Sequence, residues 1–194
     1  VDTFAYGVAR GDGLFYPSKV GKRFGYDMEE FQQAAYWRVW HNMQSLIDRG
    51  LDPLKVLIDR AHEKGMDFFA SLRLSAHEGM DPAHRIENGG GNMAHPEVRE
   101  HHYRVLEELV NDYPIEGVEL DFATPGGGLI MPTEKGPELL SAMTDYVGRI
   151  AAMVRQHPGK QIGVRVLPTE ALNRAQGIDV RAWLQQNQVD FVVP

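Results

Sequence analysis

Residues 117–122 of this chain are Gly117-Val118-Glu119-Leu120-Asp121-Phe122, a segment in which acidic and apolar side chains alternate. Successive side chains of a β-strand point to opposite faces, so Glu119 and Asp121 share one face and the apolar side chains share the other. Burying ionised carboxylates is costly unless they are paired or used. The segment therefore predicts a buried strand that aims two acids at one place, which makes it a candidate functional site.

The same alternation also offers a structural interpretation of these acids. Arg73 and Arg165 lie in the neighbouring predicted strands and fall on the inward face, so each can pair with a carboxylate. For Glu119 we favour such a buried network, with a supporting role. Asp121 stands at the carboxyl end of its strand, before a long loop, and for this residue we favour function as nucleophile or general base.

Helices and strands alternate along the rest of the chain. The Asp52-Pro53 pair begins a helix as N-cap and first residue, and Gly65 ends it. Further helices are predicted over residues 28–49, 96–113, 137–157 and 180–184 from apolar spacing and proline or aspartate starts. Strands are predicted over residues 1–8, 66–74, 117–122, 161–167 and 189–193. Such alternation requires crossover connections, which give a parallel sheet covered by helices.

The connections distinguish the two ends of this sheet. Those from helix to strand are short, whereas residues 75–95 and 123–136 form long polar links from strand to helix. In (β/α) barrels and doubly wound sheets, ligands bind at the carboxyl ends of the strands. We expect an α/β fold of the (β/α)8 TIM barrel class, with residues 1–194 forming one partial domain of about strands two to six. A doubly wound sheet stays open, although no Gly-x-Gly-x-x-Gly motif follows a strand.

The amino-acid composition of the chain limits the classes of molecule that it is expected to bind. The chain has 194 residues, a net charge of -7 and no cysteine, and its basic residues do not cluster along any helix. Nucleic acid is therefore not expected, because phosphate neutralisation needs clustered lysine and arginine. No signal peptide or membrane span is visible, and disulfides and thiolate metal sites are excluded. The compartment stays open; a soluble protein is expected, and secretion or a periplasmic location is compatible.

Two further regions of the sequence supply candidate catalytic or substrate-binding residues. Glu170 follows the predicted strand 161–167 and is either a second catalytic carboxylate near Asp121 or a cap of the next turn. The loop after Arg73 holds His77, Glu78, Asp81, His84 and His95, residues from which a mononuclear metal site could be assembled. We favour loop histidines, His77 and His95 among them, that bind substrate hydroxyls or are merely solvated. A metal held by Asp121 with either histidine is the weaker alternative, because no His-Glu-x-x-His spacing occurs, and no metal or cofactor is predicted.

Aromatic residues are concentrated in the first forty positions, where a ring-lined carbohydrate pocket is one interpretation. Trp37 and Trp40 are expected to be core residues of the helix over 28–49. Tyr6 and Tyr16 are left open, and Tyr6 is retained as a substrate-binding candidate.

Several segments together resemble those of an uncharacterised bacterial glycoside-hydrolase-like (β/α) barrel family. They are Phe15 to Gly21, Ala61 to Met66, His95 to Arg99, Tyr113 to Phe122, and Arg165 to Glu170 followed by Gly177-Ile178-Asp179. The resemblance implies a barrel that begins one strand before Val1 and continues beyond Pro194. By analogy with amylase-type glycosidases it implies an aspartate nucleophile at Asp121 and a glutamate acid at Glu170.

The first functional hypothesis is therefore a glycosidase acting on a poly- or oligosaccharide. Its catalytic residues would be Asp121, Glu170 and Glu119, and Arg73 and Arg165 would position the substrate. The alternatives are a non-catalytic carbohydrate-binding barrel and a metal-dependent TIM-barrel hydrolase or isomerase. Unpaired edge strands also predict self-association of a partial barrel.

Overall fold

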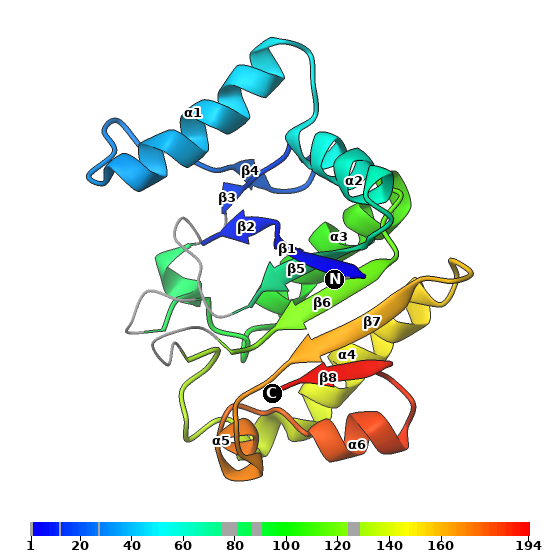
Figure 1. Cartoon of the computed structure of the whole chain (residues 1–194). Helices are drawn as coiled ribbons and strands as arrows, with labels where there is room; N and C mark the ends of the chain where they lie inside the picture. The colour runs from blue at the N-terminus through cyan, green and yellow to red at the C-terminus, as the bar shows by residue number, and fades with distance from the viewer. Residues whose placement is uncertain (1, 12, 27, 75–80, 87–90, 124–128) are drawn as a thin grey trace.

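The structure is a computed structural model that describes residues 2–11, 13–26, 28–74, 81–86, 91–123 and 129–194 (Figure 1). Helices and strands alternate along most of this length. Every helix in the described ranges is too short or too polar to cross a lipid bilayer.

The main sheet contains five parallel strands, and its spatial order equals the chain order. The strands are β1 (Thr3–Gly7), β5 (Asp67–Arg73), β6 (Gly117–Asp121), β7 (Gln161–Arg165) and β8 (Phe191–Val193). A doubly wound sheet reverses its order at a switch point, and over the described residues this sheet does not reverse. Over the described residues the sheet is open, with β1 and β8 at its edges (Figure 1).

Four helices lie on one face of the main sheet, where they contact its strands or one another. They are α2 (Pro53–Glu63), α3 (Pro96–Asp112), α4 (Leu140–Val154) and α6 (Val180–Gln185). The core lies between them and the sheet, where alternate strand residues such as Phe68, Val118 and Val164 are fully buried. The predicted helix punctuation is confirmed: the Asp52 carboxylate accepts hydrogen bonds from the first-turn amides of α2, and Gly65 has a positive φ of 70° after it.

Shorter elements complete the chain. They are the 3₁₀ turns η1 (Pro82–His84) and η2 (Pro137–Leu139) and the helix α5 (Glu170–Ala175), which Thr169 caps. The helix predicted to start at Pro137 thus opens with a 3₁₀ turn before α4, and α5 was not predicted.

The first thirty residues form a small second sheet, which was not predicted. It pairs β2 (Ala9–Arg10), β3 (Gly13–Leu14) and β4 (Lys22–Arg23). The helix that follows, α1 (Ala34–Asp48), is shorter than the predicted 28–49 and lies away from the main sheet (Figure 1).

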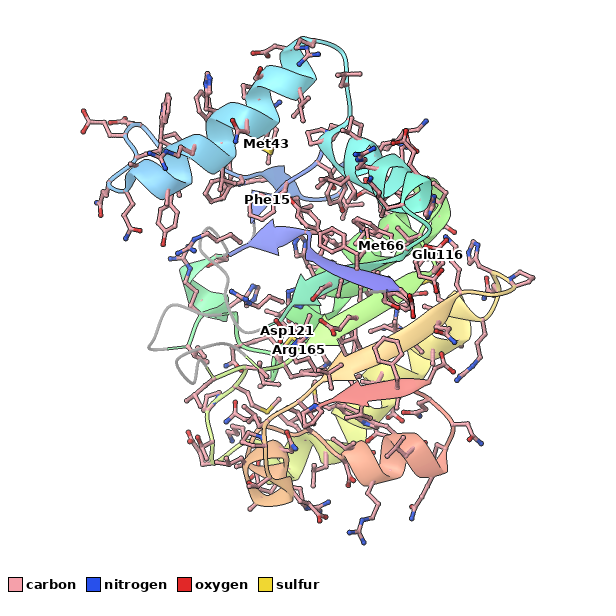
Figure 2. All side chains as sticks on the ribbon, in the orientation of Figure 1. Phe15, Met43, Met66, Glu116, Asp121 and Arg165 are labelled. Atoms are coloured by element: carbon pink, nitrogen blue, oxygen red, sulfur yellow. The ribbon has the colours of Figure 1, made fainter. Side chains whose placement is uncertain are left out.

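Helix α1 packs differently from the prediction. Met43 is its one buried residue (Figure 2), and Trp37 is 47% exposed. The expectation that Trp37 is a core residue is wrong, because α1 buries little of its surface. Trp40 is half-buried and contacts Phe31, with 5.4 Å between the ring centroids.

Glu108 ties the N-terminal segment to helix α3. Its buried carboxylate accepts hydrogen bonds from the Tyr16 hydroxyl at 3.0 Å, the Ser18 hydroxyl at 2.5 Å and the Lys19 amide at 2.6 Å. Tyr16, left open by the sequence, is therefore a buried structural residue, and burial together with Glu108 raises its pKa.

Two glycines make room for aromatic rings on the face of the sheet away from the helices. A Cβ at Gly117 would lie 2.5 Å from the Phe69 ring, and one at Gly163 would lie 2.1 Å from the Phe191 ring. The two rings meet edge to face, with centroids 5.3 Å apart. Phe191 lies level with the lower of the polar residues described next, and Phe69 lies one step of two residues deeper.

Candidate active site

A cavity of about 460 Å³ opens over the carboxyl-end half of the sheet, on the face that the helices do not cover. Ser71, Arg73, Glu119, Asp121 and Arg165 contribute polar side chains to its lining. They come from three adjacent strands, β5, β6 and β7, and Figure 2 shows Asp121 and Arg165 close together at the ends of these strands. From the long strand-to-helix links, the sequence analysis predicted the ligand site at this end of the sheet.

Strand register explains why these residues meet. Arg73, Asp121 and Arg165 are register partners across β5, β6 and β7, and they form one row of alternating charge. One step of two residues deeper, Ser71 and Glu119 are partners in the same way. Because side chains alternate along each strand, both rows project from the same face.

Glu119 is the more deeply held of the two acids. Its carboxylate accepts a hydrogen bond from the Ser71 hydroxyl at 2.7 Å and two from the Arg165 guanidinium, at 3.3 Å from Nε and 3.0 Å from Nη2. Its side chain is 3% exposed. A carboxylate bound on both oxygens is held in place, so Glu119 serves to orient Arg165.

Asp121 is held more loosely, at the mouth of the cavity. Its Oδ2 lies 3.5 Å from the Arg73 Nε, the outer limit of a hydrogen bond, and its Oδ1 accepts the Ala123 amide at 3.0 Å. Burial raises the pKa of this carboxyl, and the Ala123 amide and Arg73 act in the opposite direction. A carboxyl with a raised pKa in a cavity is suited to proton transfer.

The upper wall of the cavity comes from the N-terminal region. Phe15 and Phe24 supply apolar surface, and Tyr36 of α1 faces Arg10 of β2. The Arg10 guanidinium donates to the Tyr36 hydroxyl and lies 3.9 Å from the centre of the Tyr36 ring. Phe15 and Tyr36 belong to the aromatic-rich segment for which a ring-lined pocket was one interpretation. Sequence reasoning missed Arg10 and Ser71 as site residues; Ser71 could have been found, because it alternates with Arg73 on one strand.

Two predicted site residues lie outside this cavity. Glu170 begins α5, is 61% exposed and pairs with Arg181 at 3.3 Å, so it acts at that helix and does not face Asp121. Tyr6 lies on β1 between Ala5 and Gly7, which line the cavity, and its own ring packs on the helix side near Phe68. Tyr6 points to the helix side because side chains alternate along β1, and the register of β1 could not be assigned from the sequence.

The two predicted loop histidines are placed as follows. His95 is the residue before α3 and does not line the cavity; its ring lies 5.0 Å from that of His84. His77, with Glu78, lies outside the described residues.

Asp121 is expected to make stability depend on pH. Since burial raises its pKa above the ordinary 3.8, the folded chain binds more protons than the unfolded chain between those two values. The free energy of unfolding should therefore fall as the pH rises through that window. We expect Asp121→Asn to remove this dependence and to be at least as stable as the wild type at pH 7, as measured by urea unfolding at pH 4, 5 and 7.

Glu119→Gln is the variant whose stability is compared with that of Asp121→Asn. It weakens the contacts to Arg165 and Ser71, and we expect it to lower the free energy of unfolding by about 1–3 kcal/mol at pH 7. A comparable loss in Asp121→Asn would show that the Arg73 pair outweighs the cost of burying the Asp121 charge.

Comparison with known proteins adds information on the fold. No protein-family model matches the chain, and comparison with curated proteins found no related sequence. Among solved structures, chitinase ChiW from Paenibacillus sp. str. FPU-7 matches over 98% of this chain and 21% of its own, with 14% identity and a TM-score of 0.54. Over its length the chain therefore has the same fold as part of that chitinase.

Two other solved structures match less well. A class V chitinase from Pseudomonas fluorescens Pf-5 has 15% identity, a TM-score of 0.46 and coverage of 70% of this chain and 37% of its own. Alpha-L-fucosidase isoenzyme 2 from Paenibacillus thiaminolyticus has 14% identity, a TM-score of 0.45 and coverage of 78% and 25%. This chain thus spans well under half of each of these proteins.

Proposed function

We propose that the protein is a glycoside hydrolase that acts on a poly- or oligosaccharide, with Asp121 as the residue that exchanges a proton or attacks the substrate. The observation that carries the proposal is the placement of Asp121 and Glu119 in a cavity at the carboxyl ends of parallel strands. The glycoside-hydrolase-like fold supports it, and residues 1–194 would form about strands two to six of a (β/α)8 barrel.

Each polar residue of the cavity has a role in this proposal. Arg73 and Arg165 present guanidinium groups that can bind substrate hydroxyls, and both side chains are more than one third exposed, at 38% and 36%. Glu119 fixes Arg165. Asp121 has the raised pKa that a general acid or base requires. Phe15 and Tyr36 add aromatic rings to the lining, a kind of surface on which sugars stack, and Arg10 covers one face of Tyr36.

Glu119 and Asp121 have different parts in the proposal. They are two residues apart on one strand, so their Cα atoms are separated by about 6.6 Å and both side chains face the cavity. Asp121 is the residue that exchanges a proton or attacks, and Glu119 holds Arg165 and Ser71 in this pair. Glu170 is not included in this pair, because it lines a different hollow.

A carbohydrate-binding barrel without turnover is the second candidate. It is favoured by the arginine contacts of both acids, since a carboxylate held in an ion pair is a weaker base and a weaker nucleophile. Both candidate functions require a carbohydrate ligand, and they differ in whether the protein releases a hydrolysis product.

Gly7 allows the cavity to be tested without touching its charged residues. It lines the cavity, its φ is not positive, and a Cβ placed there would have no atom within 4 Å. We expect Gly7→Leu to fold normally and to weaken oligosaccharide binding by about 10-fold or more, because it fills the space that a sugar needs. Ser141→Leu, at an exposed position of α4, is the control that adds a leucine side chain outside the cavity.

The measurement is a glycan panel with the intact protein, read both as binding by calorimetry and as release of reducing ends. Product formation that Gly7→Leu suppresses supports the hydrolase. Binding without product supports the second candidate. If no glycan binds, or if Gly7→Leu binds as well as the wild type, the cavity is not the carbohydrate site.

A further inference from the structure

His84, His95 and Glu97 form a cluster separate from the cavity of Asp121. Each offers one donor atom, and the three atoms lie within 4.8 Å of one another. The cluster lies between β5 and α3: His84 ends η1, His95 precedes α3, and Glu97 lies in the first turn of α3. We propose that these residues bind a divalent transition-metal ion of the zinc type.

Backbone contacts, and not the histidine rings themselves, bring the two histidines together. The His84 carbonyl accepts the Asn92 amide at 2.8 Å, and an antiparallel bridge pairs Arg85 with Gly91. The Asn92 carbonyl in turn accepts the His95 amide at 2.9 Å. His84 is thereby fixed against the segment that leads into α3.

That segment is anchored from two further directions. The Met93 amide donates to the Ile130 carbonyl at 2.7 Å, and the Arg99 guanidinium donates to the carbonyls of Met93 and Ala94. Met93 is fully buried. Because the backbone on both sides is held independently, the donor atoms converge before any ion binds, which reduces the ordering that binding would require.

The donor set indicates which ions fit. Two imidazole nitrogens and one carboxylate oxygen suit zinc and its neighbours, whereas calcium and magnesium prefer oxygen ligands only. With metal–ligand bonds of about 2.0–2.2 Å, tetrahedral donors lie about 3.4 Å apart. Exposed Glu97 can rotate to close the remaining distance. Three protein ligands leave a fourth position for water, and the partial exposure of the cluster allows that.

The chain has suitable variants for a test. His95 makes no side-chain capping contact with α3, so His95→Asn removes the imidazole while introducing a residue that helix starts favour. His84→Ala and Glu97→Gln remove the other donors. His157→Ala, in the turn after α4, is the control that removes a histidine elsewhere.

The experiment titrates the metal-free protein with Zn²⁺ by calorimetry and with Co²⁺ by visible absorption, and far-UV circular dichroism checks each variant. We expect one Zn²⁺ per chain, no comparable binding of Mg²⁺ or Ca²⁺, and a tetrahedral Co²⁺ spectrum. His84→Ala and His95→Asn should each weaken Zn²⁺ binding by about 100-fold or more, and Glu97→Gln by about 10-fold. His157→Ala should bind as the wild type does.

A wild type that takes up no Zn²⁺, or a folded variant of His84, His95 or Glu97 that binds it with unchanged affinity, overturns the three-ligand site. The readout is metal binding alone and requires no glycan, so its outcome is independent of the proposed hydrolase activity.

Discussion

Replacement of Asp121 by asparagine should lower glycan hydrolysis by the intact protein by about 100- to 10,000-fold, the usual contribution of a positioned acid or base. Asparagine keeps the shape of the side chain and can still accept the Ala123 amide, but it cannot take up a proton or attack an anomeric carbon. The loss should fall on kcat, and binding of the glycan should change little, because Arg73 and Arg165 remain in the cavity.

Asp59→Asn is the matched control, since it makes the same chemical change on the exposed side of α2. It should leave kcat and KM unchanged. Turnover by Asp121→Asn within a factor of a few of the wild type would remove Asp121 from the mechanism. If Asp121→Asn loses turnover and is at least as stable as the wild type at pH 7, the loss reflects a catalytic role of Asp121. A residue that acted only through a structural ion pair with Arg73 would lose stability as well.

The second large effect concerns stability. Glu108→Ala should lower the free energy of unfolding by about 3 kcal/mol, because it removes three hydrogen bonds to a buried carboxylate and leaves the Tyr16 hydroxyl without its acceptor. For a domain of this size that corresponds to a fall in Tm of about 6–12 °C. Calorimetry and urea unfolding measure it.

Two variants test the attribution. Tyr16→Phe removes a single hydrogen bond and should cost about 1 kcal/mol. Glu107→Ala, at the adjacent and less buried position of α3, should cost about 0.5 kcal/mol. If Glu108→Ala is no more destabilising than Glu107→Ala, the N-terminal segment is not held by Glu108.

Local signals predicted most of the fold. Proline, glycine and aspartate mark helix ends through their own backbone preferences, so the helices beginning at Pro53 and Pro96 were found with errors of a residue or two. Alternation within residues 117–122 placed Glu119 and Asp121 on one face, because the period of a strand is fixed by its geometry. The small sheet of β2, β3 and β4 was missed, since strands of two residues are too short to show a period.

The candidate site was predicted less completely, because its composition depends on tertiary contacts. Glu170 follows the strand that ends at Arg165, but the direction of its side chain is set by the cap at Thr169 and by Arg181. Arg10 enters the cavity from a segment with no pattern that relates it to the sheet, and the aromatic composition of the first forty residues did not show which of their rings line the cavity. The approach of His84 to His95 likewise depends on a loop pairing that sequence spacing does not show.

The rings of Phe69 and Phe191, seated over Gly117 and Gly163, set a limit on how deep a ligand can reach. Asp121 lies in the upper polar row and Glu119 in the lower; Phe191 is level with Glu119 across Gly163, and Phe69 lies one step of two residues deeper. A ligand that passes Asp121 therefore meets an aromatic ring at the level of Glu119. If the ligand is the proposed glycan, the sugar edge that faces Phe191 is expected to be an apolar one, because a hydroxyl placed against the ring would lose its hydrogen bonds to water.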